Sequence, residues 1–297
     1  METLEALRRR IDSVQDLQSV VRTMKALAAV SIRQYEKAVE SLASYNRTVE
    51  MGFQVLLRNV PGELSARRPA RKNRLGAIVF GSDQGMCGQF NEQIAAYALA
   101  RMDERDMHRE NRRVLALGMR AMARLEEGGQ RVETAWPVPS AVSGITPLVQ
   151  DILIQVDEWG SQQAIDQVLL FYNASSVATT YRPQELHLLP FDMDQMRRLE
   201  KEHWPSRVLP TFHMDSDQLF SDLIHQHLFV SVYRALAESL ASENASRLAS
   251  MQAAEKNIQE HLEELNTLFH QQRQTAITEE LLDIISGFQV LTGQGSA

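Results

Sequence analysis

Apolar residues at the start of the chain recur at helical spacing. Leu4, Leu7, Ile11 and Val14 step by three or four residues. After one irregular step, which resembles a coiled-coil stutter, the stripe resumes at Leu17, Val21, Met24, Ala28, Val39, Leu42, Val49, Phe53 and Leu56. This spacing puts the apolar side chains on one face of a helix. The pattern predicts one helix over residues 2–58, roughly 85 Å long at about 1.5 Å per residue.

A second stripe occupies the C-terminal part of the chain. Asp215 or Ser216 can cap its start, because a side-chain oxygen accepts hydrogen bonds from free first-turn amides. A helix over residues 215–286 would span roughly 105 Å, and periodicity of this length is typical of a coiled coil. Its apolar positions include Leu219, Leu223, Val230, Leu236, Leu240, Leu248, Met251, Ile258, Leu262, Leu265, Phe269, Ile277, Leu281, Ile285 and Phe288.

Proline and glycine separate these helices from the middle of the chain. All nine prolines lie between Pro61 and Pro210, one glycine precedes Pro61, and none lies between Pro210 and Gly287. Since these residues break helices, we expect three domains: an N-terminal helix (1–60), an α/β domain (75–192) and a C-terminal helix (212–291). The helices would pair antiparallel. The longer one would project beyond its partner, and its apolar end, Ile277 to Phe288, would need a sleeve from another protein.

The middle alternates short β-type runs with helical runs. This alternation predicts a mostly parallel sheet with a Rossmann-like layout. The predicted strands are 75–80, 113–118, 132–136, 164–172 and an edge strand at 182–190, and the predicted helices are 90–105, 119–127 and 148–159.

Charge and composition narrow the function classes. The net charge is -7. Because a nucleic-acid-binding chain would be basic with interleaved aromatics, we do not expect nucleic acid among the partners. Residues 1–75 carry a net charge of +6 and residues 215–290 one of -8, which favours pairing of the two helices, although such charges also suit solvated faces. A basic cluster, Arg67 to Arg74, lies in the predicted linker. The acidic first residues argue against a secretory signal and no apolar run is long enough to span a bilayer, so we expect a cytosolic chain docked on a membrane complex.

Candidate chemistry is sparse. Glycines at 81, 85 and 88 follow the first strand, but their spacing fits neither a dinucleotide fingerprint nor a P-loop. These glycines could form a tight structural turn or a phosphate site. We favour the turn, because glycine permits positive φ. The histidines do not cluster, and the lone Cys87 suits a packed loop thiol and excludes an internal disulfide. We therefore predict no catalytic, cofactor or metal site.

Three stretches resemble one family, the gamma subunits of F-type ATP synthases. Residues 81–91, GSDQGMCGQFN, are similar to its S-D-R-G-L-C-G-x-[FL]-N stretch. Residues 8–29 resemble its N-terminal stretch, and residues 273–287 resemble its C-terminal signature R-Q-A-x-I-T-x-E-L-x-E-I-[VI]-S-G. The matches fall in order near the start, centre and end. The signature-loop residues carried over are Ser82, Asp83, Gly85, Cys87, Gly88 and Asn91.

The resemblance implies a rotary central shaft without catalytic groups of its own. Its partners would be a hexamer of alpha and beta subunits, the epsilon subunit and the membrane ring. It would lie at the cytoplasmic side of a bacterial-type cell membrane. Rotation would drive the beta subunits through their conformations, and those subunits carry the chemistry. The positions that match the family's contacts with the beta subunits are Met24, Lys25, Arg247, Gln274, Thr278 and Glu280; Met24 also suits the core of a coiled coil.

The chain departs from the family pattern at a few positions. Gln84 replaces the usual arginine, Met86 replaces a leucine, and the region after Glu255 is more acidic than the family leads us to expect. These departures suggest a divergent branch, an alternative ATPase with its own partners. Two other functions stay open on the residues alone: a non-rotary coiled-coil scaffold with an α/β recognition domain, and a small-molecule-binding or dehydrogenase-like domain with helical arms.

Overall fold

A computed structural model describes residues 3–59, 74–105, 108–176, 181–191, 198, 203–204, 208 and 210–293, with side chains of the last helix described to Ser286. Of the basic cluster Arg67 to Arg74, residues 67–73 lie outside the described residues. Two compact units make up the chain: residues 1–27 with 248–297, called the coil unit, and residues 28–247, called the body unit. The domain boundaries predicted above follow secondary structure rather than contacts, so they stay a prediction.

Two long helices run through both units, as predicted. Helix α1 spans Leu4–Asn59 and helix α6 spans Ser216–Gly293. Asp215 caps α6, because its Oδ1 accepts hydrogen bonds from the backbone N–H groups of Asp217 at 3.0 Å and Gln218 at 3.1 Å. The helix passes through Gly287 without a break and continues to Gly293, beyond the periodic run predicted over residues 215–286 and the domain end predicted at residue 291.

Within the coil unit, α1 and α6 pair antiparallel. Gln18 bonds Gln259 at 3.0 Å, and Arg22 pairs with Glu255 at 3.1 Å, so rising numbers on α1 meet falling numbers on α6. The apolar stripes of both helices form the core between them. The antiparallel pairing expected from the sequence is confirmed within this unit. The buried members of this core are Leu7, Ile11, Val21, Met251, Ile258, Leu262 and Leu265.

The body unit contains a five-stranded sheet of order β3-β2-β1-β4-β5. The strands are parallel except β5, which pairs antiparallel with β4. This order follows the first five strands of the doubly wound pattern, so the Rossmann-like layout is confirmed. The strands are β1 (Leu75–Phe80), β2 (Arg112–Leu117), β3 (Thr134–Trp136), β4 (Gln167–Ala174) and β5 (Arg182–Leu189).

Three helices accompany the sheet: α2 (Phe90–Asp103), α3 (Met119–Glu127) and α4 (Ile145–Gln162). Several boundaries differ from the sequence prediction by one or two residues, and differences of three residues occur at the start of β4 and at both ends of α4. Strand β4 starts at Gln167 instead of residue 164, because Ala164 has a φ of 54° and interrupts the extended run. Helix α4 starts at Ile145, since Pro147 falls in its first turn, where a missing N–H breaks no helical hydrogen bond.

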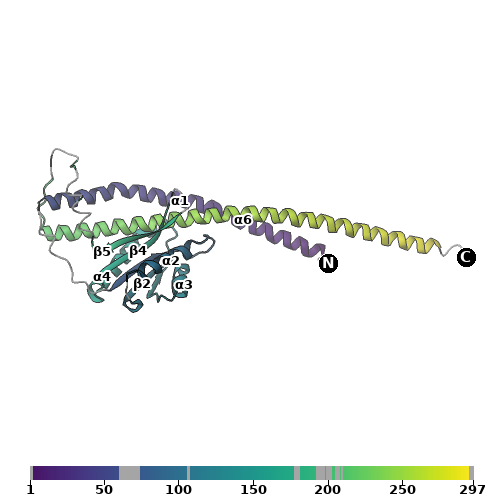
Figure 1. Cartoon of the computed structure of the whole chain (residues 1–297). Helices are drawn as coiled ribbons and strands as arrows, with labels where there is room; N and C mark the ends of the chain where they lie inside the picture. The colour runs from purple at the N-terminus through teal and green to yellow at the C-terminus, as the bar shows by residue number, and fades with distance from the viewer. Residues whose placement is uncertain are drawn as a thin grey trace. The chain divides into compact units, whose positions relative to one another are not determined.

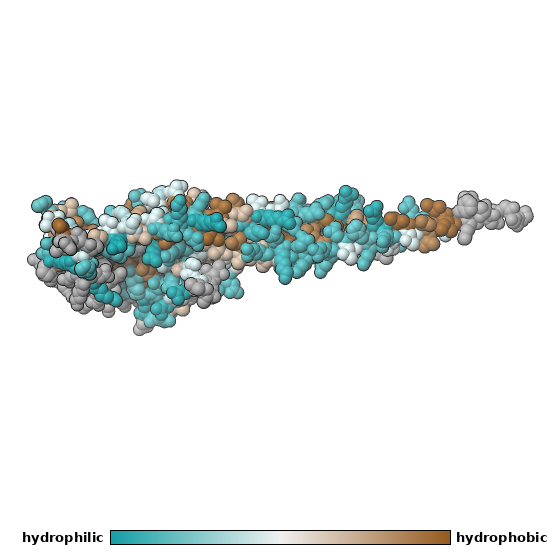
Figure 2. Space-filling view, turned by 90° about the horizontal axis from the view of Figure 1, so that it is seen from above, coloured by the Kyte–Doolittle hydropathy of each residue, from teal (hydrophilic) through white to brown (hydrophobic). Residues whose placement is uncertain are grey.

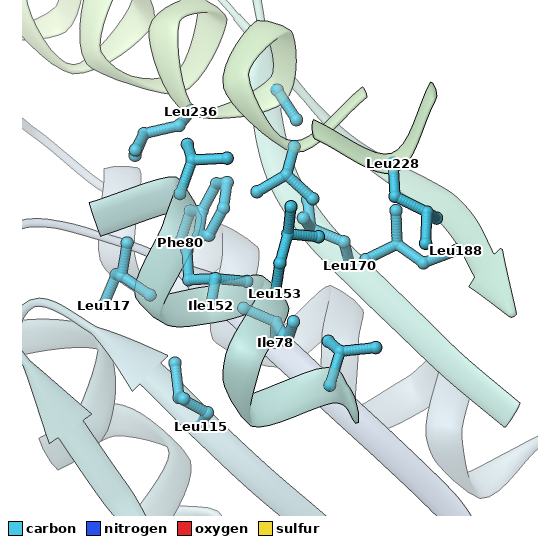
Figure 3. Packing of buried hydrophobic residues seen from close by; sticks show 14 of the residues in the cluster. Ile78, Phe80, Leu115, Leu117, Ile152, Leu153, Leu170, Leu188, Leu228 and Leu236 are labelled. Carbon is cyan, nitrogen blue, oxygen red and sulfur yellow. The ribbon is translucent and has the colours of Figure 1, made fainter. Parts of the chain in front are cut away.

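The helices cover opposite faces of the sheet. One core lies between the sheet and helices α2 and α3. The other lies between the sheet, α4 and the body-unit part of α6 (Figure 1). Figure 3 shows this second core, in which Ile78, Leu115 and Leu170 of the sheet face Leu153 of α4 and Leu236 of α6. The sheet therefore holds α6 along the body unit.

One stretch of α6 is buried around nearly its whole circumference. Small residues such as Ala235, Ala237 and Ala241 let neighbouring elements approach the helix backbone. Polar side chains are buried there too: Ser239, Ser242, Glu243, Asn244, Ser246 and Arg247. Since buried polar groups need partners, this stretch leads directly to the candidate site.

Candidate functional site

Residues 81–91 form the loop between β1 and α2 together with the first two residues of α2, and a pair of side chains closes this segment near its two ends. We call it the signature loop. The buried Ser82 donates its backbone N–H to Asn91 Oδ1 at 2.9 Å, and Asn91 Nδ2 donates to Ser82 Oγ at 2.8 Å. Ser82 Oγ also donates to the carbonyl oxygen of Gln84 at 2.8 Å. Ser82 and Asn91 therefore fix the loop's shape from within.

Asp83 ties the loop to two neighbouring segments. Its Oδ1 accepts the backbone N–H of Met119, the first residue of α3, at 3.0 Å. Its Oδ2 accepts the N–H of Val138, after β3, at 2.7 Å. A carboxylate at a helix N-terminus satisfies a free amide and complements the helix dipole. Asp83 thus acts as a structural cross-link of the body unit.

The glycines of the loop serve different purposes. A Cβ at Gly81 would lie 2.3 Å from Ala121 Cβ, so close packing against α3 requires glycine there. Gly88 has a φ of 58°, which glycine adopts without strain. Gly85 has room for a side chain, with Arg120 Nη2 at 3.9 Å as the nearest atom. The other residue with positive φ is Met86, at 60°, so the turn depends on positions 86 and 88.

Cys87 is a packed loop thiol, which confirms that prediction. The residue is 2% exposed, and its Sγ lies 3.6 Å from Ser82 Oγ and from Asn91 Nδ2. Burial raises the pKa of this thiol, although the hydrogen bond with Ser82 opposes the shift. A buried thiol with a raised pKa is a poor nucleophile at neutral pH.

Helix α6 holds the outer side of the loop through two residues. Ser246 Oγ donates to the carbonyl oxygen of Cys87 at 2.6 Å. Arg247 Nη2 donates to Glu243 Oε1 at 2.6 Å and reaches the carbonyl oxygen of Gln84 at 3.4 Å. The Arg247 and Glu243 side chains are 10% and 8% exposed, and burial raises the pKa of the Glu243 carboxyl against the effect of Arg247. This loop–α6 contact joins the sheet to the long helix inside the body unit.

The other candidate coupling residues lie in the coil unit. Met24 is half-buried against the coil core. Lys25 forms an ion pair with Glu255, which also binds Arg22. Gln274, Thr278 and Glu280 are exposed on α6, where Thr278 Oγ1 donates to the carbonyl oxygen of Gln274 at 2.9 Å. Arg247 does not share their exposed surface, because it is buried under the signature loop.

The end of the coil unit exposes a run of large apolar side chains. Ile277 is 51% exposed and Ile284 is 66% exposed, and Leu281, Leu282 and Ile285 are exposed as well. They form the brown surface next to the grey C-terminal residues in Figure 2. A contiguous exposed apolar surface of this kind marks an interaction site. The side chain of Phe288, the end of the predicted projecting segment, lies outside the described residues.

The sequence predicted the signature loop and singled out Arg247, but it did not predict the contact between the loop and α6. Glu243 and Ser246 were not singled out, although both bury polar groups at the contact. A signal was present: residues 235–247, ALAESLASENASR, carry small or polar residues on every face of the helix. A helix with such a sequence is suited to burial between two layers rather than to a single coiled-coil seam.

Across the described ranges, no three His, Cys, Asp or Glu side chains converge on a possible metal position. Nor does any helix among the described residues have the length and apolar character needed to cross a membrane.

Known proteins match this chain over almost its whole length. The family model described as ATP synthase covers residues 3–291. The ATP synthase gamma chain of Granulibacter bethesdensis is 27% identical, with 98% of this chain and 100% of the relative aligned. That of Geobacter metallireducens is also 27% identical, with 99% and 100% aligned. The chain belongs to the ATP synthase gamma chain family.

Solved structures share the fold at low sequence identity. A chain of the Euglena gracilis mitochondrial ATP synthase assembly of OSCP, F1 and c-ring has a TM-score of 0.63 at 15% identity, covering 99% of this chain and 96% of that one. A chain of the Tetrahymena thermophila mitochondrial ATP synthase central stalk and c-ring has a TM-score of 0.57 at 20% identity, covering 79% of this chain and 99% of that one. These likenesses support the fold described above.

Proposed function

We propose that this chain is the rotating central shaft of an F-type ATPase and couples ion flow through a membrane ring to ATP synthesis or hydrolysis. The observation that carries the proposal is the family match over residues 3–291 together with the antiparallel pair of α1 and α6. A shaft must resist bending and twisting. Two helices that bury a shared apolar core supply that stiffness.

The chain is a non-catalytic subunit in this proposal. The signature loop is occupied by structural hydrogen bonds: Asp83 binds two backbone amides and Cys87 is buried with a raised pKa. These groups hold the fold rather than a substrate. The nucleotide chemistry belongs to the beta subunits, and the shaft changes their conformations mechanically.

Different faces of the coil unit supply the asymmetry that rotation needs. Lys25 and Glu255 form a charged side, whereas Ile277 and Leu281 form an apolar end. We assign the apolar end to the sleeve formed by the alpha and beta subunits, because only a partner removes that surface from water. Met24, Lys25, Gln274, Thr278 and Glu280 are assigned to contacts with the beta subunits.

Arg247 has a different part in the mechanism. Because it is buried between Glu243 and the carbonyl of Gln84, it acts through the loop–α6 contact instead of touching a beta subunit directly. Torque that enters through the α/β body crosses this contact to reach the shaft. The proposed partners of the body are the epsilon subunit and the membrane ring, at the cytoplasmic side of a bacterial-type cell membrane.

Co-purification from native membranes tests the proposal. The tagged chain is expected to recover alpha, beta, epsilon and ring subunits, and the eluate is expected to hydrolyse ATP; an untagged strain is the control. The identity of the recovered subunits also shows whether the chain serves an alternative ATPase. Recovery of the chain alone, or with unrelated proteins and no ATPase activity, would contradict the rotor assignment and favour a scaffold.

A further inference from the structure

The body unit has an open groove beside α4 that is separate from the signature loop. The groove has a volume of about 770 Å³ and lies between the outward side of α4 and the segment that follows β3. Trp136 and Val138 line one wall, and Leu148 and Ile154 line the other. Ile154 is 58% exposed, which leaves a large aliphatic side chain in water on a helix that is otherwise well packed.

Two carboxylates flank this apolar patch. Asp151, Ile154 and Glu158 are three and four residues apart, so they form one stripe along α4. Asp151 and Glu158 are both exposed and stand two turns apart, roughly 10 Å along the axis. Among the described residues that line the groove, none is lysine or arginine. The stripe therefore carries an apolar side chain between two carboxylates, and no basic side chain among the described groove residues neutralises them.

Residues 137–139 of the opposite wall offer no free N–H to an added β-strand. Pro137 and Pro139 have no N–H to donate, and the N–H of Val138 already binds Asp83 Oδ2 at 2.7 Å. A partner in this groove must be recognised by its side chains rather than its backbone. A helix satisfies its own backbone groups, and an amphipathic helix fits an apolar groove by residues at helical spacing.

We propose that this groove docks an amphipathic helix of a partner polypeptide, with a basic residue facing Asp151, a second facing Glu158, and an apolar residue between them on Ile154 and Trp136. The charge pattern of α4 selects this occupant, since lysine or arginine seven residues apart complements the two carboxylates. The inference is independent of the rotor assignment, because α4 lies in the body unit and takes no part in the coil-unit contacts.

Photo-crosslinking in the assembled complex tests the proposal. Benzoylphenylalanine is placed at Ile154 of the full-length tagged chain, and at Gln150, an exposed α4 residue outside the groove lining, as the matched control. We expect a crosslink from position 154 and not from 150. Peptide mapping should find a helical partner segment with basic residues seven apart. A crosslink at 154 no stronger than at 150, or one to an acidic or extended segment, would overturn the proposal.

Charge reversal provides a second measurement. Asp151→Lys with Glu158→Lys replaces two attractive pairs by two repulsive ones, and the crosslink yield from position 154 is expected to fall about tenfold. Asp157→Lys changes an exposed α4 acid outside the groove lining and should leave the yield unchanged. An equal fall in both variants, or none in either, would contradict recognition by these carboxylates. Co-purification of the alpha and beta subunits monitors the rotor assignment separately.

Discussion

At the scale of single residues, the ion pair between Glu243 and Arg247 links α6 to the signature loop in the body unit. Both side chains are almost fully buried, and the pair also supports the carbonyl of Gln84. Removing one member of a buried pair leaves the other charge without compensation, which typically costs about 3–5 kcal/mol. By contrast, replacing both members with apolar residues is often close to neutral.

Arg247→Met is therefore expected to lower the free energy of unfolding of the body unit by about 3 kcal/mol or more. Urea unfolding followed through the fluorescence of the buried Trp159 measures it. The double variant Glu243→Leu with Arg247→Met should recover most of the loss. Arg234→Met is the matched control, because its pair with Glu238 has the same spacing on α6 but Arg234 is 63% exposed. Equal losses in the Arg247 and Arg234 variants would contradict the account.

Cys87 reports on the same contact through its reactivity. Burial raises the pKa of the thiol, so at pH 8 it carries less thiolate than a free cysteine and is shielded from reagents as well. Labelling with a disulfide reagent should be slow in the native chain and fast in urea. Ser246→Ala, which removes the hydrogen bond to the Cys87 carbonyl, should speed labelling under native conditions. Fast labelling of the unaltered chain would show that the loop is open.

Only part of this residue-scale detail is accessible from the sequence. The motif pointed to Ser82, Asp83 and Asn91, but their partners depend on which segments the fold brings together. Asp83 binds amides 36 and 55 residues away in sequence. The resemblance placed Arg247 among the contacts with the beta subunits, and in this chain α6 buries it against a loop 163 residues away. Local spacing carries no information about such separations.

At the scale of elements, the stability of the α1–α6 pair in the coil unit is expected to depend on pH. Lys25 and Arg22 lower the pKa of Glu255 from its ordinary value of 4.5. A lowered folded-state pKa means that the contribution is fully present above the ordinary value. It is lost as the pH falls through the lowered value.

The melting temperature, followed by circular dichroism, is accordingly expected to fall as the pH drops below the ordinary glutamate pKa of 4.5. Glu255→Gln removes the titrating group, so this variant should show a smaller fall over the same range. Glu260→Gln, whose partner Lys256 is an exposed neighbour on the same helix, serves as the control. Identical pH profiles for the Glu255 variant and the unaltered chain would rule out this pair as a contributor.

A substitution at Met24 in α1 can distinguish a loss of coupling from a loss of stability. Because Met24 is only half-buried at the coil core, lysine can keep its ammonium group in water. Met24→Lys should therefore lower stability by less than about 1 kcal/mol while reducing ATP-driven ion pumping per ATP hydrolysed in membrane vesicles. Val21→Lys, at a position 4% exposed, should mainly destabilise the coil. Normal pumping with lost stability in Met24→Lys would contradict the proposed contact.

The helices and strands could be predicted from the sequence more completely than the contacts between single residues. Both long helices and every strand of the sheet were found, because apolar periodicity and the distribution of proline and glycine act locally. The start of β4 was wrong by three residues, since the positive φ of Ala164 has no marker in an apolar run. The burial of residues 235–247 on all sides was also missed, because it arises from packing by elements distant in sequence.

At the scale of the whole molecule, the chain is proposed to rotate as a shaft inside a fixed hexamer. Rotation can be observed directly. Met119→Cys introduces an exposed attachment point on α3 of the body unit, while Cys87 is buried and should not compete for the label. A bead attached there would be followed with the alpha and beta subunits immobilised. ATP is predicted to drive unidirectional rotation of the bead that stops when ATP is removed. Continued ATP hydrolysis with a stationary or randomly fluctuating bead would contradict the claim.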